Sequence, residues 1–438
     1  MKLLLSLLMI AASPLLTLSD VKYINYDHLN QALLNLTIFI IFSFGLYCIL
    51  PSDSHDNGEN TYYCNGLWAF IIKCVVILTM WFTGNLNVQY HIEELKNSYA
   101  VATNIFGFIF TFWLFFKSPK NERGNTLTEK LQKFYSGVEI SPKFLGYDLK
   151  LFSISHIGMS LWGITNLVLC LYEYEITYKI NITTIFLFIM QFTYILDFYD
   201  REVWYIHTLD ITLDRAGFYL LWGSYSFMPY FYTMPMKAII FSHTPDRLGY
   251  KAGFTCWGQD YTSCMTDFAK NYWLEERPEI NKIWSFTIFV IYIIYFYMFR
   301  EANTERVKFR NVMSYADSNK IEYDKTDPDI GAYYDDKDKI LYKFMKAKYI
   351  PKGSKNSKTS FLLISNHWAI SRKINYTYDI FLSTCFGIIF RASFESMLYP
   401  TFILIVLIHR AWRDDMKCQE KYGKYWTKYK ELVPQLFL

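Results

Sequence analysis

Long apolar runs recur along the whole 438-residue chain, and they restrict its fold more than any other feature. A helix that crosses the hydrocarbon core of a bilayer needs about 20 mostly apolar residues. Runs suited to this lie at 3–18, 33–50, 67–82, 99–116, 151–172, 185–198, 216–234, 283–299, 378–390 and 397–408. They predict an all-α, polytopic membrane protein with about ten transmembrane helices, in a single integral-membrane domain over residues 1–438. Several runs are short, so we expect those helices to tilt, to extend further or to be re-entrant.

Composition and charge exclude several soluble classes. Charged residues make up 19% of the chain, below the roughly 25% of ordinary soluble domains. The net charge of +4 and the lack of a Lys/Arg tract argue against nucleic acid as a partner. The eight cysteines show no metal-site spacing, so no metal is expected. Cys256 and Cys264 share a polar loop, where they could form a disulfide or remain free thiols.

Polar segments indicate how the chain is oriented. The stretches 117–150 and 301–360 and the basic tail after His409 predict a cytoplasmic face by the positive-inside rule. The last two apolar runs then form a hairpin that returns the tail to the side of the 301–360 stretch. The N-terminus begins like a signal peptide, but its apolar stretch continues to Leu18, which favours a retained first span.

An acidic cluster is the most unusual feature of the chain. Residues 192–234 read FTYILDFYDREVWYIHTLDITLDRAGFYLLWGSYSFMPYFYTM and include Asp197, Asp200, Glu202, Asp210 and Asp214. Carboxylates beside membrane spans are costly, so their clustering predicts a functional region. Asp210 and Asp214 are four residues apart and would share one face of a helix. Glycines and prolines interrupt the apolar run that follows, which predicts irregular backbone lining a cavity. The alternative is an interfacial loop with surface ion pairs.

Two arginines follow the apolar run that ends at Phe299. Arg306 and Arg310 are four residues apart, so a helix would place both guanidinium groups on one face. Such a pair attracts an anion such as phosphate. The alternative is ordinary juxtamembrane positive charge.

The tail carries a third candidate site. Asp414, Cys418 and Tyr422 fall on one helical face, and Gly423 predicts a break before a short second helix. A face of this kind could hold a ribose hydroxyl by its carboxylate and a flat ring by aromatic stacking. The alternative is an amphipathic helix on the membrane surface. The chain has no GxGxxG, P-loop, HExxH or GxSxG motif, so a soluble Rossmann domain would not supply a nucleotide site.

Two long motifs resemble a known family. HRAWRDDMKCQEKYGKYW (409–426) resembles the C-terminal signature of the sterol reductase family, which covers the Δ14, Δ7 and Δ24(28) reductases. LDITLDRAGFYLLWG (209–223) resembles that family's other signature. Its DRAGFY wording, followed by Tyr-Thr-Met-Pro at 232–235, most resembles 7-dehydrocholesterol reductases. Weaker similarity extends over nearly the whole chain.

The resemblance implies an NADPH-dependent oxidoreductase with ten membrane helices, in the endoplasmic reticulum or a related membrane. Its sterol side would lie at about 190–240, and its NADPH-binding half at about 300–438. By position, the NADPH residues would be Arg306, Arg310, Leu363, Trp368, Asn375, Tyr376, Asp414, Cys418, Lys421, Tyr422 and Tyr429. Candidates for the sterol cavity are Glu202, Asp210, Asp214 and Trp222.

The chemistry of a ring double bond that carries no activating carbonyl sets the order of events. Such an olefin accepts hydride poorly, so a proton should arrive first and hydride from NADPH second. The resemblance suggests Tyr232 and Asp414 for the proton path. We therefore expect reduction of the C7–C8 double bond of a Δ5,7-sterol. The alternatives are Δ14 or Δ24(28) reduction, sterol binding without catalysis and, more distantly, an S-adenosylmethionine-dependent membrane methyltransferase.

Several positions depart from the family pattern. Leu213 stands where the family usually has histidine. The family usually has an acidic residue or cysteine at the position of Ser224 and tryptophan at that of Phe227. It usually has glycine at the positions of Asn366 and Ala369. The family also continues after Val-Pro with a longer terminal motif, whereas this chain ends with residues 433–438. These changes predict weaker turnover or a changed substrate, and they leave the expected fold intact.

Overall fold

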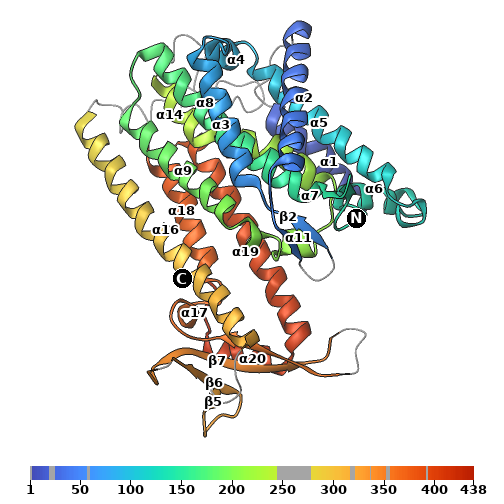
Figure 1. Ribbon diagram of the computed structural model, residues 1–438, viewed down its shortest axis with the longest axis vertical. Coiled ribbons are helices and arrows are strands. Elements are labelled where there is room, and N and C mark those ends of the chain that lie inside the picture. Colours follow the sequence, from blue (N-terminus) through green and yellow to red (C-terminus); the bar gives the residue numbers. More distant parts are fainter. Residues whose placement is uncertain are drawn as a thin grey trace. The chain divides into compact units, whose positions relative to one another are not determined.

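The computed structural model describes residues 2–18, 25–56, 60–243, 278–315, 321–335, 337–351, 356–390 and 393–438. The chain forms two compact units, Met1–Ile283 and Trp284–Leu438 (Figure 1). Most of both units is helical. The predicted cysteine pair, Cys256 and Cys264, lies outside the described residues.

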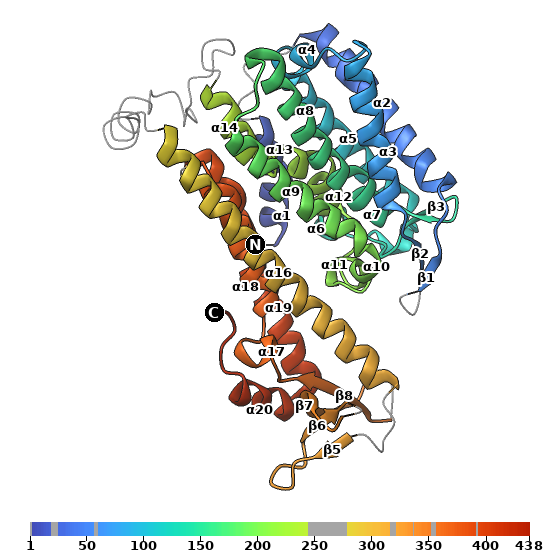
Figure 2. The ribbon, with the colours of Figure 1, turned by 60° about the vertical axis from the view of Figure 1, so that its left-hand side comes forward.

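The first unit is a bundle of long helices joined by short helices and two small hairpins (Figure 2). Helix α3 packs against α8 and α9, and α2 packs against α5. The helices are α1 (Lys2–Leu18), α2 (Tyr26–Ile49), α3 (Gly66–Phe82), α4 (Val88–Glu93), α5 (Lys96–Lys117), η1 (Lys120–Glu122), α6 (Leu127–Ser136), α7 (Leu149–Leu151), η2 (Phe152–Met159), α8 (Ser160–Thr177), α9 (Ile182–Asp200), α10 (Glu202–Tyr205), α11 (Leu209–Thr212), α12 (Phe218–Trp222), η3 (Gly223–Phe227), α13 (Met228–Phe231) and α14 (Met234–His243). The hairpins pair β1 (Ser54–Asp56) with β2 (Thr61–Tyr63), and β3 (Lys143–Phe144) with β4 (Tyr147–Asp148).

Six helices in the described part of the chain are long and apolar enough to cross a membrane. They are Tyr26–Ile49, Lys96–Lys117, Leu149–Thr177, Ile182–Asp200, Lys282–Ser314 and Phe394–Tyr422. Two further apolar helices, Met9–Leu18 and Gly66–Phe82, are shorter. The chain is therefore mostly helical with several candidate spans, as a polytopic membrane protein requires.

The run 216–234 is the apolar segment in which irregular backbone is predicted. Residues 218–231 are continuously helical, as α12, the π-helical η3 and α13, so the predicted irregular backbone is limited here to a π-helical turn that begins at Gly223. A second π-helical segment, η2, packs against η3, and all eight of its residues are buried. Rings of Tyr47 and Phe152 stack at 5.8 Å in the same core. Because π-helical turns are rare and gather at functional sites, this core is a region of interest.

The second unit combines three long helices with a sheet (Figures 1 and 2). Its helices are α16 (Pro278–Tyr315), α17 (His367–Ile370), α18 (Ile374–Ile388), α19 (Phe394–Tyr422) and α20 (Lys424–Leu432). Its antiparallel sheet has the order β5 (Ile321–Tyr323), β6 (Ile330–Tyr334), β7 (Ile340–Tyr349) and β8 (Lys358–Leu363). Helices α18 and α19 pack against each other, and α19 and α20 both contact β7.

The sheet corrects the prediction of an all-α chain. It occupies the polar stretch 301–360, where no strand was expected. A short alternation in β7 was the available signal, since Tyr342 and Phe344 are buried while Lys343 between them is exposed. The ring of Phe344 lies 6.2 Å from that of Phe309 on α16, so the sheet covers the polar end of that helix.

Candidate functional site

Two neighbouring arginines mark the second unit. Arg306 and Arg310 both lie on α16, one turn apart, as their spacing predicts. Within the described residues, no carboxylate forms an ion pair with either arginine. The guanidinium carbon of Arg306 lies 5.2 Å from the ring centre of Trp368, and that indole donates to the carbonyl of Ala302 at 3.0 Å. Two neighbouring cations without a counter-charge, beside an aromatic wall, favour an anionic ligand with a flat ring.

Residues of the tail pack against the sheet of the same unit. Tyr429 is buried and donates its hydroxyl proton to the carbonyl of Leu363 at 3.0 Å. The hydroxyl of Tyr422 donates to Ser360 at 3.2 Å. Burial raises the pKa of Tyr429 to about 12, so its hydroxyl stays protonated at neutral pH. The ammonium of Lys421 lies 4.8 Å from the ring centre of Tyr422.

The start of α18 completes the set of expected cofactor residues. Asn375 is buried, and its amide donates to the side-chain oxygen of Asn303 on α16 at 3.2 Å. Leu363 and Trp368 are also buried. The segment before the predicted hairpin and the tail after it therefore meet within this unit, as expected. Gly423 ends α19 with φ +54° and precedes α20, which confirms the predicted break.

One contact in this unit escaped prediction from the sequence. The ammonium of Lys373 contacts the carboxylate of Asp414, which joins the start of α18 to α19. Lys373 and its neighbour Arg372 are both buried. The only sequence signal was a basic pair placed directly before an apolar run, which is usually an exposed position.

In the first unit, Glu202 is the most enclosed of the predicted sterol-side carboxylates. It is 2% exposed and accepts hydrogen bonds from the backbone of Gly66 at 2.9 Å and from the hydroxyl of Ser155. Burial raises the pKa of Glu202 to about 7, although the nearby ammonium of Lys73 opposes the rise. The alternative of an interfacial surface loop therefore fails for this residue.

Near Glu202 lies a buried cation. Lys73 on α3 donates to the carbonyl of His156 at 2.8 Å and to the hydroxyl of Ser160 at 2.9 Å. That hydroxyl also pairs with the hydroxyl of Tyr199 at 2.9 Å. A buried ammonium is tolerated only when polar groups surround it, and these contacts supply them.

Asp210 and Asp214 do not share a helical face, which corrects the prediction. Helix α11 ends at Thr212, so only Asp210 is helical. Asp210 accepts from the hydroxyl of Tyr205 at 3.1 Å, and the backbone carbonyl of Asp214 accepts from Lys150 at 2.7 Å. Beyond this loop, the backbone at Gly217 lies directly against residues 135–137.

Of the other residues predicted for the sterol side and the proton path, Trp222 and Tyr232 lie in the same unit as Glu202, and Asp414 lies in the second unit. Tyr376 on α18 and Cys418 on α19 also lie in the second unit. Trp222 is buried and donates its indole proton to the side chain of Asn104 at 2.7 Å. The ring of Tyr232 lies edge-on to that of Trp162, with centroids 5.0 Å apart. Across the described ranges, no group of three His, Cys, Asp or Glu side chains is placed to hold a metal ion.

Comparison with known proteins decides the family. The sequence profile of the Ergosterol biosynthesis ERG4/ERG24 family matches residues 14–256 and 264–438. The chain belongs to this family. It is 29% identical over 389 residues to a probable 7-dehydrocholesterol reductase of Acanthamoeba polyphaga mimivirus, covering 87% of this chain and 73% of the relative. It is 27% identical over 413 residues to the 7-dehydrocholesterol reductase of Arabidopsis thaliana, covering 90% and 82%.

A relative with another specificity is similar over a comparable length. The Δ14-sterol reductase of Methylotuvimicrobium alcaliphilum is 25% identical over 382 residues, covering 86% of this chain and 74% of the relative. The comparisons thus confirm the sterol reductase resemblance read from the two motifs. They support an oxidoreductase of sterol biosynthesis with a multi-pass membrane architecture.

Proposed function

We propose that this protein reduces the C7–C8 double bond of a Δ5,7-sterol with NADPH. The observation that carries the proposal is the pair Arg306 and Arg310, which has no carboxylate partner among the described residues and stands beside Trp368. The relatives named 7-dehydrocholesterol reductase and the DRAGFY wording of residues 214–219 support the choice of bond. The whole chain would act as one domain with ten membrane helices, in the endoplasmic reticulum membrane with its tail in the cytoplasm.

The residues of the second unit fit a phosphorylated dinucleotide. Arg306 and Arg310 would hold phosphate, because guanidinium groups bind phosphate oxygens through paired donors. The remaining expected contacts are Leu363, Trp368, Asn375, Tyr376, Asp414, Cys418, Lys421, Tyr422 and Tyr429, on β8, α17, α18, α19 and α20. When bound, NADPH supplies the hydride that the reduction needs.

The protein's own part is to deliver a proton and to shape the sterol cavity. Tyr232 and Asp414 are the residues proposed for the proton path, which delivers a proton to an olefin carbon of the sterol. Glu202, Asp210, Asp214 and Trp222 are proposed for the sterol side. Aromatic walls suit this chemistry, since a π-face stabilises the positive charge that protonation creates on the sterol.

The test is sterol profiling of cells that accumulate Δ5,7-sterols, with and without this protein. Wild type should remove the C7–C8 double bond, and Asp414→Ala should not. Lys348→Met, at an exposed residue of β7, is the matched control and should behave as wild type. Persistence of Δ5,7-sterols in cells whose membranes hold the protein would refute the Δ7 assignment.

A Δ14-sterol reductase is the second candidate, because a relative with that name matches 86% of this chain. The same cells supplied with Δ14-sterols would reveal it. Loss of the Δ14 bond without loss of the Δ7 bond selects this function. Failure with Δ7, Δ14 and Δ24(28) substrates selects a sterol-binding protein without catalysis.

Arg310→Ala tests the phosphate role directly. We expect it to raise the KM for NADPH at least tenfold while the KM for sterol changes less than threefold, because a lost charge-assisted contact to phosphate is worth about 1.5–3 kcal/mol. Steady-state kinetics with each substrate varied in turn would measure both constants. Equal increases in the two constants would contradict a phosphate contact.

A further inference from the structure

The segment after α20 turns back onto the start of α18. Residues 433–438 lie along Ser371–Lys373, and the two stretches are hydrogen-bonded through their main chains. The amide of Arg372 donates to the carbonyl of Gln435 at 3.0 Å, and the amide of Lys373 donates to that of Leu436 at 3.1 Å. We call residues 433–436 the strap.

A buried arginine reinforces the strap. The guanidinium of Arg372 donates to the carbonyl of Val433 at 2.6 Å and to that of Pro434 at 2.8 Å. The hydroxyl of Ser371 donates to the carbonyl of Leu436 at 2.7 Å. Arg372 is only 9% exposed, so its charge serves these carbonyls and is not presented to solvent. Five hydrogen bonds thus hold three consecutive residues before α18.

Lys373, which the strap holds through its backbone amide, contacts α19 through its side chain. Lys373 is 8% exposed, and its ammonium contacts the carboxylate of Asp414. The neighbouring carboxylate, Asp415, accepts from the indole of Trp426 at 3.0 Å and lies 3.8 Å from the ammonium of Lys430. Asp415 is therefore engaged elsewhere, and Asp414 is the partner of Lys373.

We propose that Lys373 is a positioning residue for Asp414, and that the strap holds Lys373 in place. The inference rests on the proposed function only in assigning Asp414 to the cofactor site. A half-buried carboxylate that loses its cation must either turn to solvent or accept a proton. Either change would remove Asp414 from the geometry that a ribose or proton-transfer contact needs.

The charges around Lys373 make the arrangement sensitive to pH. Burial, followed by the positive charge of Arg306, lowers the pKa of Lys373 to about 7, while Cys418 and Asp415 oppose the shift and Arg372 adds to it. The contact with Asp414 favours the ammonium form. As the pH rises the ammonium is lost, and NADPH affinity should fall with it. Arginine stays charged throughout, so Lys373→Arg should remove this step.

The first arm of the test measures binding without turnover. Purified full-length protein in detergent would be titrated with NADPH, and cofactor fluorescence followed in the absence of sterol. At pH 6.5 we expect Lys373→Met to raise the Kd at least tenfold and Lys373→Arg to stay within threefold of wild type. The double variant Lys373→Met/Asp414→Asn should be no weaker than the weaker single variant, because the pair acts as one unit. Lys348→Met is the exposed control.

The second arm detects the pair without cofactor. A carbodiimide activates a carboxylate, and a lysine in contact with it then forms an amide while the reagent becomes a urea. Mass spectrometry should find a crosslink between Lys373 and Asp414 in wild type. Arg372→Met, which frees the strap, should reduce that crosslink at least threefold, and the apparent unfolding temperature checks that the variant is folded.

Together the two experiments distinguish failure of the contact from failure of the positioning role and from failure of the proposed cofactor. Absence of the crosslink overturns the contact itself. A crosslink with unchanged NADPH affinity in Lys373→Met overturns the positioning role. If wild type forms the crosslink but does not bind NADPH at any pH, the proposed cofactor fails, and the positioning role fails with it while the contact stands.

Discussion

At the scale of single residues, burial separates carboxylates that look alike in the sequence. Glu202 and Asp210 are eight positions apart in one acidic cluster. Glu202 is enclosed and held by Gly66 and Ser155, whereas Asp210 is half-buried and held by Tyr205. The enclosed setting of Glu202 raises the pKa of its carboxyl group.

Glu202 should make stability depend on pH. Its pKa of about 7 lies above the ordinary 4.5, so the folded protein binds a proton that the unfolded chain has lost between these values. This contribution is fully present below about pH 4.5 and is lost as the pH rises through 7, by on the order of 3 kcal/mol at most. The apparent unfolding temperature of wild type should fall between pH 5 and 8, and that of Glu202→Gln should fall less.

The control for Glu202 is Glu122→Gln, which changes an exposed carboxylate of η1. Its unfolding temperature should follow wild type at every pH. A Glu202→Gln profile parallel to wild type from pH 5 to 8 would show that Glu202 titrates normally in the folded protein.

At the scale of elements, close backbone contacts explain why the motif at 209–223 contains a glycine at position 217. A Cβ added at Gly217 would lie 2.1 Å from the backbone nitrogen of Gly137 and 2.5 Å from the carbonyl oxygen of Tyr135. The adjacent amide of Ala216 donates to the carbonyl of Glu139 at 2.9 Å. The start of α12 is therefore docked directly on the segment after α6.

Gly217→Ala should separate these two segments. The added methyl group has no space, so we expect destabilisation by about 3 kcal/mol or more, toward or beyond the upper end of overpacking costs. Gly223→Ala is the matched control, because a Cβ there meets nothing within 4 Å. Apparent unfolding temperatures in detergent would compare the two variants. Equal unfolding temperatures for the two variants would show that the backbone around Gly217 accommodates a methyl group without loss of stability.

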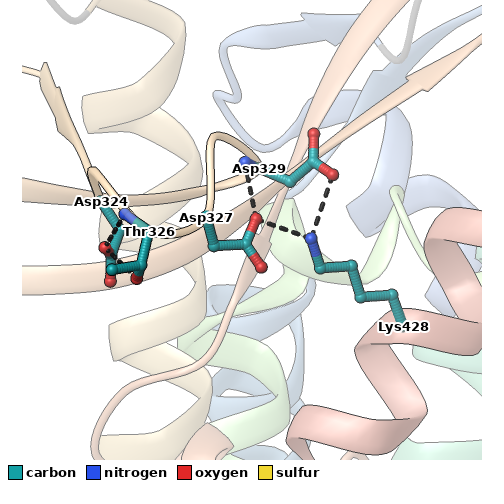
Figure 3. A network of polar contacts seen from close by, with 5 residues as sticks. All are labelled: Asp324, Thr326, Asp327, Asp329 and Lys428. Atoms are coloured by element: carbon teal, nitrogen blue, oxygen red, sulfur yellow. Dashed lines mark hydrogen bonds and ion pairs between the residues drawn. The ribbon is translucent and has the colours of Figure 1, made fainter.

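Ion pairs join the sheet of the second unit to α20. Lys428 lies 2.6 Å from Asp327 and 3.1 Å from Asp329 in the β5–β6 turn, where Asp324 also accepts from the backbone and hydroxyl of Thr326 (Figure 3). The hydrogen bond from Lys428 holds the pKa of Asp327 below its usual range. This contribution is present above the unfolded pKa and is lost as the pH falls through the folded one.

Lys428→Ala should loosen the turn without unfolding the unit, since exposed ion pairs contribute little. We expect severalfold faster hydrogen exchange at the amides of Ile330 and Lys346, which donate to Asp327 and Asp329. Mass spectrometry of the β6 and β7 peptides would measure it. Wild type in about 1 M salt should approach the variant because salt screens the pairs. Unchanged hydrogen-exchange rates, both in the variant and at high salt, would show that these ion pairs do not stabilise the turn.

At the scale of the whole molecule, the apolar runs predicted helices well and their limits poorly. Each predicted run contains helix, yet six helices in the described part of the chain meet the length and composition of a span. The run 216–234 contains a π-helical turn, and 378–390 falls in the 15-residue helix α18. Hydropathy reports which segments avoid water. It does not report where packing against a neighbour converts an α-helix into a π-helical turn.

Most of the candidate cofactor site was predictable, and its connections were not. The candidate residues came from the C-terminal motif, from the wider family resemblance and from helical spacing, which placed Arg306 with Arg310 and Asp414 with Cys418. Lys373 escaped because a basic residue before an apolar run ordinarily faces water. The strap escaped because all its acceptors are main-chain carbonyls, which leave no signature in side-chain types.

The sequence by itself determined the membrane class, the family and the helical spacing of the charged residues. These depend on local periodicity and on motifs, which are properties of neighbouring positions. Only the tertiary structure decided which charges are enclosed and which partner each one meets. Lys373 and Asp414 are 41 positions apart, and Glu202 reaches Gly66 across 136. Contacts at such separations depend on how the elements pack, and packing follows from all the side chains of a unit together.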